Sequence, residues 1–291
     1  MTTFDRRTLC WAEFGPEAGR PVMFFHGGND SRLAGSLLEA EALAIGVRLI
    51  CPERPGFGRS TFQPGRGLLD WSSDVEQLAD RLDLGWFGIV GHSGGGPHAL
   101  ACAAALPERV ARVATVSSVA PPPATNRGLH PMFRVVNALM NHPTLYRTVA
   151  RSQLRQMSKH ADHWLRAWAK MQPADGAMFR EQPRIAAMVL AEMTEAVQAG
   201  PAGLVHEASL YHRNWGFELS AIQTTTTVWH GASDRQATPA WAHFLADNIP
   251  SASLTLLDGA GHFSTLLDNA ATILTELATP NTGAENRNDL P

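Results

Sequence analysis

A serine flanked by glycines follows a short apolar run in the first third of the chain. The run Phe87-Gly88-Ile89-Val90 precedes Gly91-His92-Ser93-Gly94-Gly95, and an alanine-rich stretch from Pro97 to Leu106 comes next. This order predicts a strand, a sharp turn and a helix, and G-x-S-x-G at such a turn is typical of a nucleophile elbow. The turn would raise the Ser93 hydroxyl above the end of a sheet. The pattern therefore predicts acyl transfer through a serine.

A serine hydroxyl needs a base that accepts its proton, and the base needs an acid that fixes its tautomer. Ligand sites of parallel sheets lie at the carboxyl ends of the strands, so both partners are expected directly after strands. Asp234 follows a predicted strand over 224–229, and His262 follows another over 253–257. The order serine, aspartate, histidine is the one expected for this elbow. We therefore predict Ser93 as the nucleophile, Asp234 as the acid and His262 as the base.

Two further assignments complete the predicted site and keep their alternatives. Asp258 is the rival acid, but we expect it at the end of the strand that precedes His262, so it ranks second. The oxyanion of a tetrahedral intermediate needs two backbone N–H groups. One belongs to Gly94, the residue after the nucleophile, and the other to Gly28 in the loop after an early strand. Asn29 is the alternative to Gly28.

The elements that must position these residues alternate between strands and helices in the first half of the chain. Strands are predicted over 8–14, 21–25, 47–51, 87–90 and 110–116, and helices over 31–45 and 97–106. A capping box, Ser73-x-x-Glu76, predicts the start of another helix. Because the strands lack polar alternation and helices follow them, we expect a parallel sheet that is covered on both faces.

The strand–helix alternation stops near residue 119 and returns near residue 220. The intervening segment has helical stretches broken at prolines, whereas strands over 224–229 and 253–257 and a helix over 239–248 follow it. This predicts an α/β core domain from 1–119 and 220–278, with a helical cap inserted over 120–219. The polar tail over 279–291 is expected to be disordered.

Composition narrows the class of protein further. The chain has 291 residues, 44% of them hydrophobic, and a net charge of −3, which gives no reason to expect nucleic acid or an anionic membrane as partner. No apolar run approaches the length of a membrane span, and the N-terminus lacks the apolar region of a signal peptide. The three cysteines have no metal-binding spacing. We expect a cytoplasmic monomer or homodimer that acts on a small-molecule substrate.

These features together resemble the α/β-hydrolase fold family over residues 8–278. The resemblance is carried by the elbow, Asp234, His262, His26-Gly27-Gly28 and the loop Pro52–Ser60, where Glu53 stands in the family's usual aspartate position. It implies a mostly parallel sheet flanked by helices and a helical cap inserted after the sixth strand. It also implies that Ser93, Asp234 and His262 form the catalytic triad, and that neither cofactor nor metal takes part.

The implied activity is serine-dependent hydrolysis of a small to medium apolar carboxylic ester, or a related acyl substrate, through an acyl-enzyme. Prolyl aminopeptidases are similar around His26-Gly27-Gly28, but they usually carry a tryptophan where this chain has Gly94 and a Pro-Gly where it has Asn29-Asp30. A peptidase therefore ranks below an esterase. Hydrolysis of a carbon–carbon bond or a lactone on the same triad, and a ligand receptor with little turnover, are the remaining alternatives.

Overall fold

The computed structural model describes residues 1–280, apart from the side chains of residues 155, 157, 158, 161 and 164. The tail predicted over 279–291 thus lies outside the described residues, except for its first two positions.

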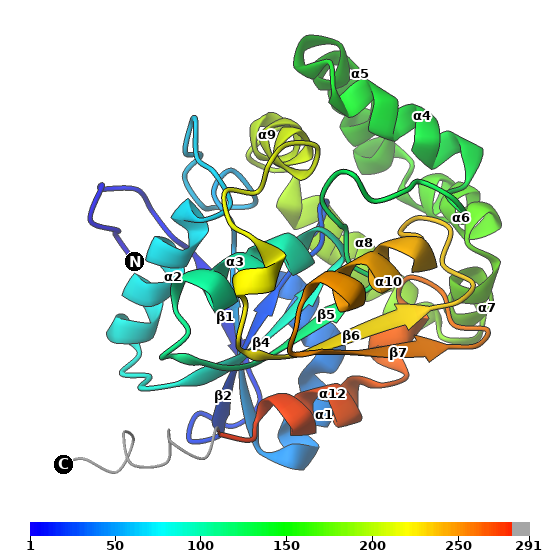
Figure 1. Cartoon of the computed structure of the whole chain (residues 1–291). Coiled ribbons are helices and arrows are strands. Elements are labelled where there is room, and N and C mark those ends of the chain that lie inside the picture. Colours follow the sequence, from blue (N-terminus) through cyan, green and yellow to red (C-terminus); the bar gives the residue numbers. More distant parts are fainter. Residues whose placement is uncertain (281–291) are drawn as a thin grey trace.

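A mostly parallel sheet forms the centre of the molecule (Figure 1). In the described chain it has seven strands in the order β1-β3-β2-β4-β5-β6-β7, and β1 is antiparallel to its neighbour β3. The strands are β1 (Trp11–Phe14), β2 (Arg20–Phe25), β3 (Val47–Pro52), β4 (Phe87–His92), β5 (Val110–Val116), β6 (Thr225–Gly231) and β7 (Ala252–Leu257). Because β2 and β4 to β7 run parallel, the loops that follow these strands meet at one edge of the sheet.

Helices cover both faces of the sheet because successive side chains of the strands are buried on opposite sides. Phe25 and Ile89 pack in the core beneath α2 (Asp70–Arg81), α3 (Gly96–Ala105) and α10 (Pro239–Asn248), whereas Phe24 and Val90 pack in the core on the other face. That second core lies beneath α1 (Glu39–Ile45) and α12 (Ala270–Leu277), which are side by side in Figure 1. The predicted doubly covered sheet is confirmed.

Two helix predictions are corrected by the structure. The capping box at Ser73 is not a helix start, because α2 begins at Asp70, whose carboxylate accepts a hydrogen bond from Gly67 N at 2.7 Å one turn earlier. The helix predicted over 31–45 is divided into a 3-10 helix, Arg32–Leu38, and the α-helix α1.

Helices fill the chain between β5 and β6. They are α4 (Pro131–Met140), α5 (Pro143–Lys159), α6 (Ala161–Met171), α7 (Pro173–Glu181), α8 (Pro183–Ala196) and α9 (Ala202–Tyr211). Prolines at the first helical position start α4, α5, α7 and α8, where the missing N–H costs no intrahelical bond. In the described sheet this segment follows the fifth strand rather than the sixth, since Thr2 and Thr8 form an isolated bridge instead of a further strand ahead of β1.

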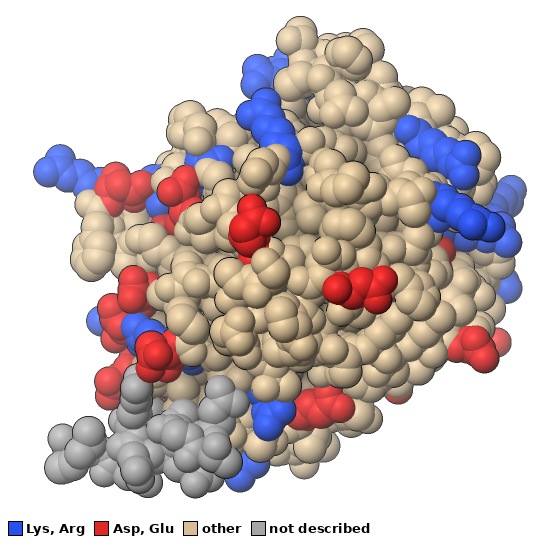
Figure 2. Space-filling model, viewed as in Figure 1, with Lys and Arg blue, Asp and Glu red and all other residues tan. Residues whose placement is uncertain are grey.

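The surface and the helix lengths bear on possible partners. Figure 2 shows acidic and basic side chains spread over the visible face with wide uncharged areas between them. Within the described residues, no helix combines the length and apolar character that a membrane crossing requires. A short helix, α11 (Ser264–Leu267), follows the loop that carries His262 after β7.

Candidate active site

Ser93 lies at a sharp turn between β4 and α3, with its backbone in the left-handed region at φ 53°. Such a conformation costs a side-chain-bearing residue about 1–3 kcal/mol, and strain of this kind is enriched at active sites. The flanking glycines permit the turn. A Cβ atom on Gly91 would lie 2.6 Å from the carbonyl oxygen of Gly95, and one on Gly95 would lie 2.1 Å from that of Phe25. The predicted strand, turn and helix are thus present, and Ser93 lines a cavity above the sheet.

Asp234 and His262 meet at the same edge of the sheet. Asp234 follows β6 and is buried, and His262 Nδ1 lies 2.7 Å from its Oδ2 atom. The other carboxylate oxygen, Oδ1, accepts hydrogen bonds from the backbone nitrogens of Gln236 at 2.8 Å and Ala237 at 3.0 Å. This arrangement holds the imidazole with a proton on Nδ1, so that Nε2 of the neutral ring is an acceptor. Asp258 is exposed after β7, and no hydrogen bond joins it to His262 within residues 1–280.

The proximity of Asp234 and His262 shifts the pKa of both groups. Burial alone would raise the pKa of Asp234, but the neighbouring His262 and the backbone N–H donors hold it below its ordinary value. Burial alone would lower the pKa of His262, but the Asp234 carboxylate raises it above the ordinary value. The pair therefore favours a negative aspartate beside a histidine that readily takes up a proton.

The loop that carries His262 is held by a carboxylate from the helical segment. Asp175, in the first turn of α7, is fully buried, and its Oδ2 atom accepts a hydrogen bond from His262 N at 2.7 Å. Its Oδ1 atom accepts bonds from Phe263 N at 3.1 Å and from both Ser264 N and Ser264 Oγ at 2.9 Å. Gln172, just before α7, accepts a bond from Arg235 N at 3.1 Å. The helical segment therefore contributes directly to the position of the candidate base.

Gly28 and Gly94 are neighbours beside Ser93. A Cβ atom on Gly94 would lie 3.2 Å from Gly28 N, and both residues line the cavity that Ser93 lines. The turn after β2 is fixed by Asp30, whose carboxylate accepts a hydrogen bond from Gly27 N at 2.9 Å. Asn29 lines the same cavity, so the choice between Gly28 and Asn29 as the second donor stays a prediction.

A buried ion cluster lies behind this turn. Arg54 donates to the carbonyl oxygens of His26 and Gly27 and forms an ion pair with Glu207 of α9 at 2.7 Å. Arg66 pairs with the same carboxylate at 2.5 Å. Burial alone would raise the pKa of Glu207, but the two guanidinium groups hold it well below its usual range. Helix α9 is thereby bound to the turn that carries the predicted oxyanion donors.

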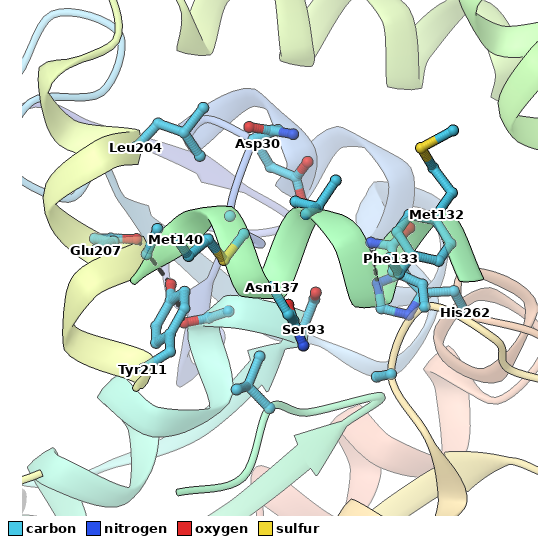
Figure 3. Close-up of a pocket in the computed structure, with 18 of the residues that line it drawn as sticks. Asp30, Ser93, Met132, Phe133, Asn137, Met140, Leu204, Glu207, Tyr211 and His262 are labelled. Carbon is cyan, nitrogen blue, oxygen red and sulfur yellow. Dashed lines mark hydrogen bonds between the residues drawn. The ribbon is translucent and has the colours of Figure 1, made fainter. Parts of the chain in front are cut away.

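Helices α4 to α9 close the cavity above Ser93. The cavity has a volume of about 450 Å³, and apolar side chains of α4, α6, α7 and α8 supply much of its lining. In the view of Figure 3, α4 crosses the cavity and carries Phe133, Asn137 and Met140, while Tyr211 and Ser93 lie behind it. Tyr211 also donates a hydrogen bond to the carbonyl oxygen of Gly94 at 3.0 Å. The space suits a small organic molecule with a mainly apolar part.

Several residues of the site carried no signal in the sequence. Arg54 lies in the loop Pro52–Ser60, whose sequence resembles a family motif but does not indicate an ion pair. Glu207 and Asp175 lie in helices whose pattern shows only an apolar face. Among the described residues, no group of three or more His, Cys, Asp or Glu side chains is arranged to hold a metal ion.

Comparisons with known proteins place the chain in a family. Residues 20–268 match the alpha/beta hydrolase fold family. A non-heme chloroperoxidase from Streptomyces lividans is 38% identical over 124 residues, which are 42% of this chain and 45% of that relative. A 2-hydroxymuconate semialdehyde hydrolase from Pseudomonas sp. (strain CF600) is 28% identical over 265 residues, covering 87% of this chain and 84% of that relative. The crystal structure of a bromoperoxidase from Bacillus anthracis superimposes with a TM-score of 0.68 at 21% identity, covering 93% of this chain and 95% of that one.

The chain therefore belongs to the alpha/beta hydrolase fold family. The match with the chloroperoxidase spans less than half of that protein's length, and the likeness to the bromoperoxidase establishes a shared fold.

Proposed function

We propose that this protein is a serine hydrolase that cleaves a small to medium apolar carboxylic ester, or a related acyl substrate, through an acyl-enzyme. The observation that carries the proposal is the buried His262–Asp234 hydrogen bond of 2.7 Å at the wall of the cavity that also contains Ser93. A serine in a left-handed turn that lines the same cavity as His262 fits the arrangement required for nucleophilic catalysis.

The mechanism follows from the atoms that face the cavity. Ser93 Oγ attacks the substrate carbonyl carbon while its proton passes to His262 Nε2, and Asp234 stabilises the imidazolium. The carbonyl oxygen gains charge and meets the N–H groups of Gly28 and Gly94, each worth about 3–4 kcal/mol of barrier. The leaving alcohol takes the proton from His262. Water then attacks the acyl-serine by the same route and releases the acid.

The helical segment 120–219 is proposed to act as the cap that selects the substrate. Its side chains form much of the wall of the roughly 450 Å³ cavity, and that wall is mainly apolar. A cavity of this size accommodates a medium-length acyl chain or a small ring. The two ion pairs of Glu207 and the hydrogen bonds of Asp175 connect this segment to the core, which supports a stable rather than a loosely attached cap.

A second candidate is hydrolysis of a small organic acid such as 2-hydroxymuconate semialdehyde. The relatives with that name, from Pseudomonas putida and Pseudomonas sp. (strain CF600), cover 84% and 87% of this chain, so the match includes the helical segment. The same triad would serve, but a carbon–carbon bond rather than an ester bond would be hydrolysed, and a different group would fill the cavity.

A series of p-nitrophenyl esters from acetyl to octanoyl tests the proposal and measures the depth of the cavity. Wild-type protein should hydrolyse them with an optimum at intermediate chain length, and Ser93→Ala should lose turnover and labelling by a fluorophosphonate. Ser233→Ala, an exposed serine in the loop before α10, is the matched control and should behave as wild type. Equal turnover by Ser93→Ala and wild type would exclude the proposed nucleophile. Ligand-induced stabilisation without turnover would favour a receptor.

A further inference from the structure

Gln236 lies against the nitrogen of His262 that the proposed mechanism uses. Its side-chain nitrogen Nε2 is 3.2 Å from His262 Nε2, and its Oε1 atom accepts a hydrogen bond of 2.8 Å from the indole N–H of Trp168 in α6. Trp168 is itself buried, with its ring 5.5 Å from that of Phe263 and 5.7 Å from that of Phe179. A side chain of the helical segment therefore fixes the orientation of an amide at the candidate base.

The position of each proton in the hydrogen bonds from Trp168 through Gln236 to His262 follows from the chemistry of the three side chains. The indole nitrogen of Trp168 can only donate, so the oxygen of Gln236 must face it and the amide NH₂ must face His262. Since Asp234 accepts the proton on Nδ1 of the imidazole, Nε2 of the neutral ring is an acceptor. The amide of Gln236 thus donates to Nε2.

Ser93 needs the same lone pair. Its hydroxyl proton must pass to Nε2 of His262 when Oγ attacks. Within the described residues, however, no hydrogen bond joins Ser93 Oγ to that nitrogen, and the side chain of Gln236 contacts it instead. We propose that Gln236, held by Trp168, is a positioning residue that covers the lone pair of the base until substrate displaces it. This inference rests on the proposed serine hydrolase function.

The location of Gln236 and Trp168 links the covering of His262 Nε2 to the size of the substrate. Gln236 and Trp168 both line the cavity that would hold the acyl group. An acyl group long enough to press on Trp168 moves the amide away from His262, whereas a short one leaves it in place. The arrangement therefore selects against short acyl groups, and removal of the amide should benefit short esters more than long ones.

The experiment measures the rate at which a small fluorophosphonate labels the protein as a function of pH. In this reaction Ser93 Oγ forms a bond to phosphorus, fluoride leaves, and the hydroxyl proton passes to His262 Nε2. Gln236→Ala should label about two- to tenfold faster, because one neutral hydrogen bond no longer competes for Nε2. Its acid limb should move to higher pH, because the amide donates only to the neutral ring. The ratio of acetyl to octanoyl ester turnover should rise as well.

The charged and titratable groups around His262 stay unchanged in this variant. They come from several elements, namely Asp30 after β2, His92 of β4, Asp175 of α7, His230 of β6 and Asp234 after β6. A shift of the acid limb can therefore be assigned to the loss of the amide.

Trp168→Phe provides a second variant if Gln236→Ala does not fold. It removes the N–H donor together with part of the ring volume and keeps an aromatic ring against Phe179 and Phe263, and it should accelerate labelling in the same direction. Gln182→Ala, an exposed glutamine before α8, is the matched control. Labelling of wild type at Ser93 together with equal or slower labelling of Gln236→Ala would overturn this inference and leave the proposed function standing. No labelling of wild type would overturn both.

Discussion

Asp175→Asn is the substitution that isolates the contribution of the helical segment to the candidate base. The carboxylate accepts three hydrogen bonds on Oδ1 and one on Oδ2, and the bond on Oδ2 comes from the backbone nitrogen of His262. An amide can keep the three bonds on its oxygen but places an NH₂ group against that N–H. A buried donor left without a partner costs about 1–3 kcal/mol. The three retained bonds also lose the strength that the negative charge gives them.

The expected total is a loss of about 3 kcal/mol in the free energy of unfolding. The fall in kcat/KM should be about ten- to a hundredfold, because the imidazole moves relative to Ser93. Loss of the Asp175 charge also lowers the pKa of His262, so the acid limb of kcat/KM should move to lower pH. Urea denaturation and ester turnover measure these effects. Asp247→Asn, on the exposed side of α10, is the control and should change stability by less than about 0.5 kcal/mol. Wild-type stability and turnover in Asp175→Asn would refute this reasoning.

Three further substitutions test other contacts of the site. Burial and the nearby Asp30 raise the pKa of Glu192 far above its ordinary value of 4.5. The neutral carboxyl therefore stabilises the fold at low pH, and this contribution is lost progressively as the pH rises from about 4.5 towards the raised pKa. Urea denaturation should therefore show Glu192→Gln becoming more stable relative to wild type between about pH 5 and pH 8. A difference in unfolding free energy between the two proteins that does not change with pH would contradict a protonated Glu192 in the folded protein. Gly94→Ala keeps its own N–H but places a Cβ atom 2.5 Å from Tyr211 Oη and 3.2 Å from Gly28 N, so it displaces the donors of the proposed oxyanion hole. It should lower kcat at least about tenfold, as measured by ester kinetics. Glu207→Gln leaves two buried arginines without a carboxylate and should cost about 3–5 kcal/mol in unfolding free energy, so a loss below about 1 kcal/mol would show that the cluster is dispensable.

The parts of the site that follow strands could be predicted from the sequence. Ser93, Asp234 and His262 each come after a short apolar run, and the parallel arrangement of those runs brings their ends to one edge. The glycine pattern at the elbow has a local steric cause, so it too is visible in sequence.

Contacts between distant segments could not be predicted in the same way. Arg54 and Glu207 are 153 residues apart, and Asp175 precedes His262 by 87 residues. Nothing in the periodicity of α7 or α9 distinguishes a carboxylate that turns inward from one that faces water. Such pairs depend on how the helices between β5 and β6 pack on the sheet, and local pattern does not determine that packing.

The most direct test of the proposed function is to identify the covalent intermediate. Wild-type protein mixed with p-nitrophenyl butyrate and rapidly quenched should carry a butyryl group, and peptide mass spectrometry should locate it on Ser93. The adduct should be absent from Ser93→Ala. Turnover without an acyl-protein, or a butyryl group on another residue that persists in Ser93→Ala, would contradict catalysis by this serine.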